Sequence, residues 1–314
     1  MALGTVDPAA GKTSLRRGRR HPGERIIEVL LVVAAAVSVA TTAGIIFSLA
    51  EPAIEFFREV SVVEFLTGTR WTPTFADKHY GVLPLVTATL LSTIIAIFVA
   101  VPLGLGSAIY LAEYATDRTR RLVKPVLEIL AGVPTVVYGF FALFGLNPIL
   151  QRYWPGGEAP AFQNLLVAGI VMGFMIVPTV ASLSEDAMSA VPRSLREGAY
   201  ALASSRMQVA LRVVVPAAIS GIVASFVLAV SRALGETMIV TMAGGLSSDS
   251  VIFNPIKAAA TMTAYIANIS QGDIPVGTVD YDTVFAVGSL LFIFTFALNA
   301  LSLRLVRRFR EVYE

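Results

Sequence analysis

Two charged residues, Arg232 and Glu236, lie in a stretch of the sequence, 213–248, that carries no other charge. A guanidinium is a permanent cation whose N–H groups can bind the oxygens of a tetrahedral oxyanion, and phosphate suits it. A carboxylate four residues further along a helix lies on the same face, close enough to pair with it. Two interpretations follow: an ion pair that fixes this helix to its neighbours, or an anion-binding Arg232 that Glu236 orients and neutralises when no anion is bound.

The hydroxyl groups of Ser231 and Thr237 flank this pair in the sequence. They could add hydrogen-bond donors to an anion site. Small polar residues also help membrane helices to pack closely, which is their commoner role. We predict that Ser231, Arg232, Glu236 and Thr237 line a substrate pathway.

The elements that must position these residues are membrane-spanning helices. Of 314 residues, 55% are hydrophobic and 15% are charged, and the apolar residues form long blocks. A hydrocarbon layer about 30 Å thick needs about 20 apolar helical residues to cross. The blocks are continuous, whereas barrel strands alternate apolar and polar residues. The sequence therefore predicts an all-α membrane protein with six transmembrane helices, at about 26–50, 82–112, 126–151, 161–184, 215–246 and 283–305.

Basic residues set the predicted orientation, because they collect near span ends on the cytoplasmic side. Arginines are concentrated in the N-terminal tail, in two alternate connections and in the C-terminal tail, whereas segments 51–80 and 247–282 carry mainly acidic charges. We therefore predict a multi-pass membrane protein with both termini in the cytoplasm. Residues 1–25 are predicted to form a disordered basic tail near anionic lipid, and residues 26–310 the six-helix domain.

The sequence contains no motif that supports catalysis by this chain. Gly11 and Lys12, followed by Thr13 and Ser14, resemble the end of a phosphate-binding loop, but Val6 stands where that motif needs a glycine. Cysteine is absent, which excludes thiol catalysis, and the two histidines lie in the tail and in an outer loop. We predict a transport subunit and not an enzyme, with no cofactor or metal of its own and no nucleic-acid partner. Any ATP and Mg²⁺ would be bound by partner subunits.

The predicted cytoplasmic connection 185–216 is too long for a simple turn. Pro192 can begin a helix, and Ser204 and Ser205 offer a break within the connection. Apolar residues recur between these points at roughly helical spacing: Leu195, Ala199, Leu202, Met207 and Leu211. The pattern predicts two short amphipathic helices. They could rest on lipid headgroups or form a docking surface for another subunit.

The same connection resembles the EAA loop of permease subunits of bacterial ABC importers. That signature places Glu-Ala-Ala, then Gly, then Ile-x-Leu-Pro at a spacing that this chain keeps, with Gly198 in place of the first Ala and Ala203 in place of the Gly. Both exchanges are between small residues. The resemblance implies a contact with an ATP-hydrolysing subunit, made by Glu197, Gly198, Ala199, Tyr200, Leu202 and Ala203.

Longer segments resemble the C-type permease of phosphate-specific ABC importers, from about residue 24 to the C-terminus. They are residues 65–73, 80–90, 101–114, 132–139 and 231–238. The first, which contains Trp71, separates the C type from the sister A type. The resemblance implies a multi-pass protein of the bacterial plasma (inner) membrane, with a type I importer permease fold that forms half of a translocation pathway. It also implies four partners: an A-type sister permease, a B-type ATP-binding subunit dimer, an extracytoplasmic S-type phosphate-binding protein, and phosphate itself.

Three alternatives remain open at this point. The chain could carry another oxyanion, such as sulfate, molybdate or phosphonate, or it could be the A-type sister permease. It could also be an ion-coupled secondary transporter that works alone, although no internal repeat is visible in its sequence.

Overall fold

A computed structural model describes residues 22–309 of the chain, except residues 273 and 276. The described residues are mainly helical, and their only β pairing is an isolated antiparallel bridge between Trp71 and Tyr80. Residues 1–21 of the predicted basic tail lie outside the described residues. Its last part, from Pro22, is helical, in contrast to the predicted disorder. Proline is well suited to the first turn of a helix, because its missing N–H would have no partner there.

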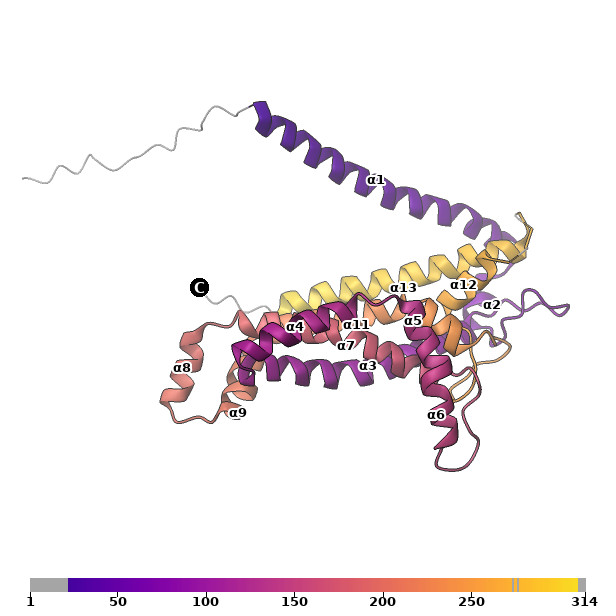
Figure 1. The fold of residues 1–314 in the computed structure, drawn as a ribbon. Coiled ribbons are helices and arrows are strands. Elements are labelled where there is room, and N and C mark those ends of the chain that lie inside the picture. Colours follow the sequence, from indigo (N-terminus) through magenta and orange to yellow (C-terminus); the bar gives the residue numbers. More distant parts are fainter. Residues whose placement is uncertain (1–21, 273, 276, 310–314) are drawn as a thin grey trace, which may run out of the picture. The chain divides into compact units, whose positions relative to one another are not determined.

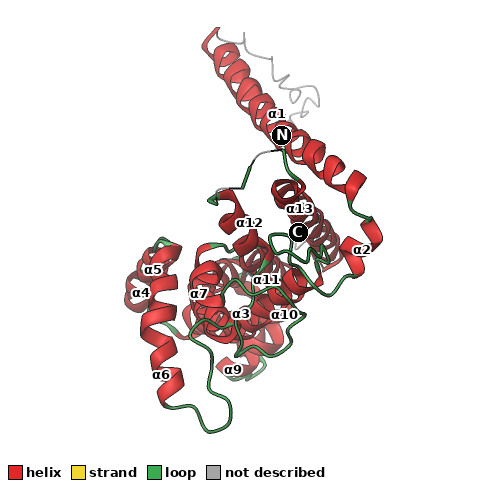
Figure 2. Cartoon of the chain, turned by 90° about the vertical axis from the view of Figure 1, so that its right-hand side faces the viewer, coloured by secondary structure: helices red, strands yellow, loops and turns green. Residues whose placement is uncertain are grey.

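The chain forms two compact units, residues 1–48 and 49–314. Helix α1 (Pro22–Glu59) begins in the first unit and ends in the second. Within the described residues, the first unit consists of the apolar N-terminal part of α1. The second unit contains all the other elements, which Figures 1 and 2 show as ribbons.

Three long helices of the second unit are apolar enough to cross a membrane: α3 (Leu83–Ile109), α7 (Leu165–Ser189) and α13 (Val279–Phe309). Together with α1 they make four candidate spans among the described residues, or six if each of two bent helix pairs is one span. The π-helical turn η1 (Tyr110–Tyr114) extends α3 to the end of its span.

The first bent pair changes direction by 84° and joins α4 (Asp117–Ala131) to the segment 135–152. That segment consists of α5 (Thr135–Phe140), η2 (Phe141–Leu146) and α6 (Asn147–Arg152). Its bend falls at Gly132, Val133 and Pro134, because the proline ring removes a backbone donor and keeps the residue before it out of the helical region. The predicted span 126–151 is therefore two helical pieces.

The second bent pair changes direction by 73° between residue 217 and α11 (Ile219–Leu234). Its first part is formed by α9 (Arg206–Val209), η3 (Ala210–Val214) and α10 (Val215–Ala217). Helix α11 ends at Leu234, and a separate helical segment, 238–244, follows it with the π-helical turn η4 (Val240–Gly244). The predicted span 215–246 is thus also interrupted.

Helices α3 and α7 pack closely along their lengths (Figure 1). Small residues make this possible: a Cβ added to Gly169 or Gly173 of α7 would lie within 2.8 Å of side-chain or backbone atoms of α3. Gly104 of α3 approaches Val180 of α7 in the same way. Such small residues let membrane helices approach closely where no hydrophobic effect drives them together. The main buried cluster lies at this contact and includes Ala96, Ala100, Met172, Met175 and Ile176.

An aromatic cluster closes the end of the second unit at which α3 begins. Trp71 is fully buried, and its ring meets those of Phe65 and Tyr265 edge to face at 5.9 and 5.2 Å. Phe65 lies in α2 (Val62–Thr67) and Tyr265 in α12 (Met262–Ser270). Because these rings come from distant parts of the sequence, the cluster joins the loop 68–82 to the segment before α13.

Gly68 and Gly81 allow two distant parts of the loop 68–82 to come into close backbone contact. A Cβ added to Gly81 would lie 2.2–2.4 Å from backbone atoms of Gly68. Backbone atoms cannot rotate away as a side chain can. We expect Gly81→Ala to lower the free energy of unfolding by about 1–3 kcal/mol, as overpacking does. Thermal unfolding of the detergent-solubilised protein measures this.

The matched control is Gly106→Ala, where an added Cβ meets nothing within 4 Å. In a helix this exchange should stabilise by about 0.5–1 kcal/mol through propensity alone. Equal melting temperatures for the two variants would contradict the close backbone contact between Gly68 and Gly81.

Candidate functional site

Glu236 lies at the break between α11 and the helical segment that follows it. Its Oε1 accepts hydrogen bonds from the backbone N–H groups of Met238, at 3.0 Å, and Ile239, at 3.2 Å. These amides begin a helix and have no partner within it, and a carboxylate also interacts favourably with the positive end of the helix dipole. The side chain of Glu236 is buried. Glu236 therefore caps the second half of a broken helix.

Arg232 lies in the last turn of α11, and its Nη1 donates a hydrogen bond of 3.0 Å to the hydroxyl of Thr179 in α7. Among the described residues, no carboxylate lies within ion-pair distance of Arg232. The predicted pairing of Arg232 with Glu236 is therefore wrong. The helix ends at Leu234, so the spacing of four residues no longer places both side chains on one face, and the carboxylate binds free amides instead.

The other two predicted pathway residues make separate contacts. Ser231 donates to the side-chain oxygen of Asn299 in α13, at 2.8 Å, and so joins α11 to α13. Thr237 donates to the carbonyl oxygen of Gly235 at 3.3 Å. In the described part of the chain, no hydrogen bond links Ser231, Arg232, Glu236 and Thr237 to one another. Sequence reasoning missed Thr179, because one threonine in an apolar helix carries no distinguishing pattern.

The connection after α7 forms the two short helices that its pattern predicts. Helix α8 (Arg193–Ala201) follows Pro192, and α9 begins at Arg206 after Ser205, whose hydroxyl accepts the N–H of Gln208 in a capping box. Most of the predicted contact residues are exposed, and the side chain of Leu202 has an exposed fraction of 84%. Ala199 differs, because it is half-buried and packs on the cluster that contains Met188, Val209 and Val214.

Ala203 adopts a φ of +59°, which is the left-handed region. It is the only non-glycine residue with positive φ in the described part of the chain. The EAA signature has its glycine at this position, and the backbone conformation gives the physical reason, since glycine adopts positive φ without a steric penalty.

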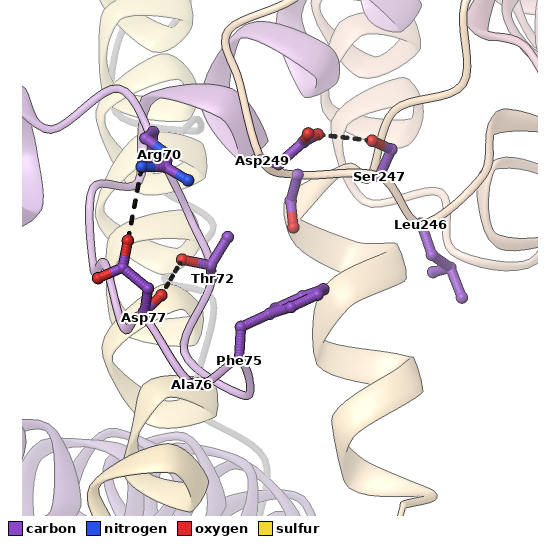
Figure 3. A pocket seen from close by; sticks show the side chains of 9 residues that line it. Arg70, Thr72, Phe75, Ala76, Asp77, Leu246, Ser247 and Asp249 are labelled. Atoms are coloured by element: carbon purple, nitrogen blue, oxygen red, sulfur yellow. Dashed lines mark hydrogen bonds and ion pairs between the residues drawn. The ribbon is translucent and has the colours of Figure 1, made fainter.

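An open pocket of about 550 Å³ lies near the start of α3, at the far end of that helix from α8. Figure 3 shows its lining, which comes from the loop 70–77 and from the segment 246–249 that follows η4. Arg70 lies 3.7 Å from Asp77, and Ser247 donates to Asp249 at 2.9 Å. The carboxylates offset the single cation, so the pocket does not favour an anion. It contains none of the predicted pathway residues.

The described residues hold no group of three or more His, Cys, Asp or Glu side chains that could bind a metal ion. The arrangement offers an arginine in the last turn of an apolar helix and an exposed helical segment at one end of the bundle.

Solved structures of ABC transporters share this fold. A chain of a bacterial alginate ABC transporter, solved with its pentasaccharide-bound periplasmic protein, matches with a TM-score of 0.63 at 13% identity, over 91% of this chain and 95% of that one. A chain of the MetNI methionine ABC transporter matches with a TM-score of 0.52 at 20% identity, over 74% and 95%. The fold is that of an ABC importer permease.

The model of one protein family matches residues 100–311. The chain belongs to this family, the inner membrane components of binding-protein-dependent transport systems. It is therefore a multi-pass inner membrane protein and a transport subunit, within a system that depends on a binding protein.

Curated relatives cover most of the chain. The probable ABC transporter permease protein YqgH of Bacillus subtilis is 35% identical over 85% of this chain and 86% of its own length. The phosphate transport system permease protein PstC of Mesorhizobium japonicum is 34% identical, over 78% of each chain. PstC 1 of Mycobacterium tuberculosis is 32% identical over 78% of this chain and 82% of its own length.

The conformation of Ala203 leads to a first prediction at this site. A left-handed conformation costs an L-residue about 1–2 kcal/mol, and glycine avoids this cost. The greater freedom of glycine in the unfolded chain offsets part of the resulting gain in stability. We expect Ala203→Gly to stabilise the turn by up to about 1 kcal/mol. Ala203→Val should weaken it, because β-branched residues avoid positive φ. Hydrogen exchange of amides 198–206 should slow in the first variant and accelerate in the second; equal rates would contradict the left-handed turn.

The separate contacts of Arg232 and Glu236 lead to a second prediction. A double-mutant cycle on stability with Arg232→Met and Glu236→Gln should give a coupling energy below about 0.5 kcal/mol, as for residues that do not interact. Arg196 and Glu113 form a buried ion pair. A control cycle with Arg196→Met and Glu113→Gln should therefore give a clearly larger coupling energy. A coupling of similar size in both cycles would show that Arg232 and Glu236 pair after all.

Proposed function

We propose that this chain is the C-type permease subunit of an ATP-driven phosphate importer. Its relatives in Mesorhizobium japonicum and Mycobacterium tuberculosis are named as phosphate transport system permeases, and they align with more than three quarters of the chain. The resemblance of residues 65–73 to the C type supports the same assignment. Inorganic phosphate is the proposed cargo.

The observation that carries the proposal is the environment of Arg232. It lies in a helix whose other residues are uncharged, and within the described residues its only hydrogen-bond partner is the neutral hydroxyl of Thr179. A charge at the centre of a bilayer costs about 2.5–3.5 kcal/mol on insertion scales, so the guanidinium favours a water-filled pathway and an anionic partner. A tetrahedral oxyanion can accept two of its N–H groups at once.

In the proposed assembly this chain forms one half of the pathway and an A-type sister permease forms the other. Two B-type subunits bind ATP and Mg²⁺, and an extracytoplasmic S-type protein delivers phosphate. This chain contributes no cofactor and no covalent chemistry. Both termini and α8 lie on the cytoplasmic side, as the arginine-rich segments predict.

The proposed mechanism is alternating access by rigid-body motion. Closure of the ATP-binding dimer moves the exposed face of α8, which carries Glu197 and Tyr200, together with Leu202 directly after the helix. The two permease halves then tilt, and the pathway at Arg232 opens outward to receive phosphate. Glu236 acts in this scheme as the cap that holds the start of the second half-helix in place.

The test is Arg232→Ala in the complete complex, reconstituted in proteoliposomes with ATP inside and the binding protein outside. We expect phosphate uptake to fall by at least about tenfold, which equals the loss of about 1.4 kcal/mol. Co-purification of all subunits should persist, since the side chain of Arg232 makes a single hydrogen bond within the described residues. Arg232→Lys keeps the charge and loses the planar fork, so it should retain part of the uptake.

The matched control is Thr179→Val, which removes the hydrogen-bond partner of Arg232 and keeps the guanidinium; it should reduce uptake less than Arg232→Ala. Wild-type uptake in Arg232→Ala would refute the substrate role of this residue. Uptake of sulfate, molybdate or phosphonate in preference to phosphate would refute the cargo. Uptake without an ATP-hydrolysing subunit would indicate a secondary transporter instead.

A further inference from the structure

Arg196 closes the corner between α7 and α8. Its Nη2 donates to the carbonyl oxygen of Met188 at 2.7 Å, and its Nη1 donates to that of Val191 at 2.6 Å. Carbonyl groups at a helix C-terminus have no partner within the helix, and they interact favourably with cations. Pro192 follows directly, where α7 has ended. Arg196 therefore fixes the direction in which α8 leaves α7.

The same guanidinium binds Glu113, which lies in η1 at the end of α3. Its Nε and Nη2 both donate to Oε1 of Glu113, at 3.1 Å each. The side chain of Glu113 has an exposed fraction of 5%, and that of Arg196 17%. Charge-assisted hydrogen bonds are stronger than neutral ones, and a buried pair is screened little by salt. A single side chain thus joins α3, α7 and α8.

A second group of charges at this end of the bundle does not reach α8. Lys124 of α4 binds Glu185 and Asp186 of α7 at 2.8 and 2.6 Å, and Arg120 lies 3.3 Å from Glu185. This group joins α4 to α7. Within the described part of the chain, the pair Glu113–Arg196 is accordingly the only ion pair between α8 and the membrane-spanning helices.

Apolar contacts hold α8 against the bundle independently of this pair. Leu195 and Ala199 pack on a buried cluster that includes Ala108 of α3 and Met188 of α7. These contacts are non-directional, and they keep α8 near its place without fixing its angle. Loss of the ion pair should therefore loosen α8 without removing it.

We propose that the ion pair Glu113–Arg196 transmits movement of α8 to α3 and α7. The inference rests on the proposed function, in which an ATP-hydrolysing subunit moves the exposed face of α8. Arg196 precedes Glu197 directly, so a displacement of that face reaches α3 through directional hydrogen bonds. Glu113 and Arg196 are positioning residues, since they act on the pathway only through the helices that they join.

The experiment measures phosphate uptake and ATP hydrolysis together in the reconstituted complete complex. Glu113→Gln removes the charge and keeps the shape of the side chain. We expect the phosphate transported per ATP hydrolysed to fall by about 2- to 30-fold, the range found when residues that couple two sites are altered. Arg196→Lys keeps the charge and loses the fork, so it should lower the same ratio. Co-purification of all subunits should persist.

The matched control is Asp280→Asn. Asp280 of α13 accepts two hydrogen bonds from Lys78, at 2.9 and 2.8 Å, near the far end of α3 from α8. The two side chains form an ion pair at 2.8 Å, and the hydrogen bond to Asp280 raises the pKa of the Lys78 ammonium above its usual value. Its loss should leave the ratio of phosphate to ATP unchanged.

Three results would overturn the inference: an unchanged ratio in Glu113→Gln, an equal fall in Asp280→Asn, or failure of both Glu113→Gln and Arg196→Lys to assemble. Failure of both variants to assemble would mean that the ion pair is required for folding and does not serve to transmit movement. The proposed function fails in a different way, namely when the wild-type complex shows no ATP-dependent phosphate uptake.

Discussion

The close contact between α3 and α7 is the constraint on which the rest of the structure depends. Glycines at the contact bring the two backbones together. In a membrane the gain from such a contact is mainly packing, so it is sensitive to every added methyl group. Both candidate sites use these two helices: α7 supplies Thr179 to Arg232, and the ends of α3 and α7 together hold Arg196.

The two charges of the fifth span show how helix geometry decides the role of a residue. Glu236 comes after a break, where free amides are available, and these amides satisfy its carboxylate within the chain. Arg232 comes before the break, and the residues around it offer one neutral hydroxyl. The same segment thus contains a charge with a structural role and a charge whose environment is incomplete in this chain.

The sequence was enough to predict the helical membrane fold, since the lengths of the charge-free runs are read directly from the order of the residues. It also predicted the two helices after α7, because Pro192 and Ser205 are local signals. The glycine that the signature has at the position of Ala203 indicated an unusual backbone conformation, and the positive φ of Ala203 explains it. The predicted pairing of Arg232 with Glu236 was wrong, because it assumed a continuous helix through Gly235, whereas α11 ends at Leu234. Glu113 was missed because its partner lies 83 residues away, and no local pattern marks such a contact.

The positions of the two sites on α7 give the proposed coupling a simple geometric basis. Thr179 and Met188 are nine residues apart, so at 1.5 Å per residue they are separated by about 13.5 Å along the helix. A helix of this length is stiff, and the close contact with α3 prevents it from bending alone. A rotation imposed at Met188 through Arg196 therefore moves Thr179, and Arg232 must follow or exchange its hydrogen bond. An anion bound at Arg232 would act on the same equilibrium from the other side, since coupling between two sites is reciprocal.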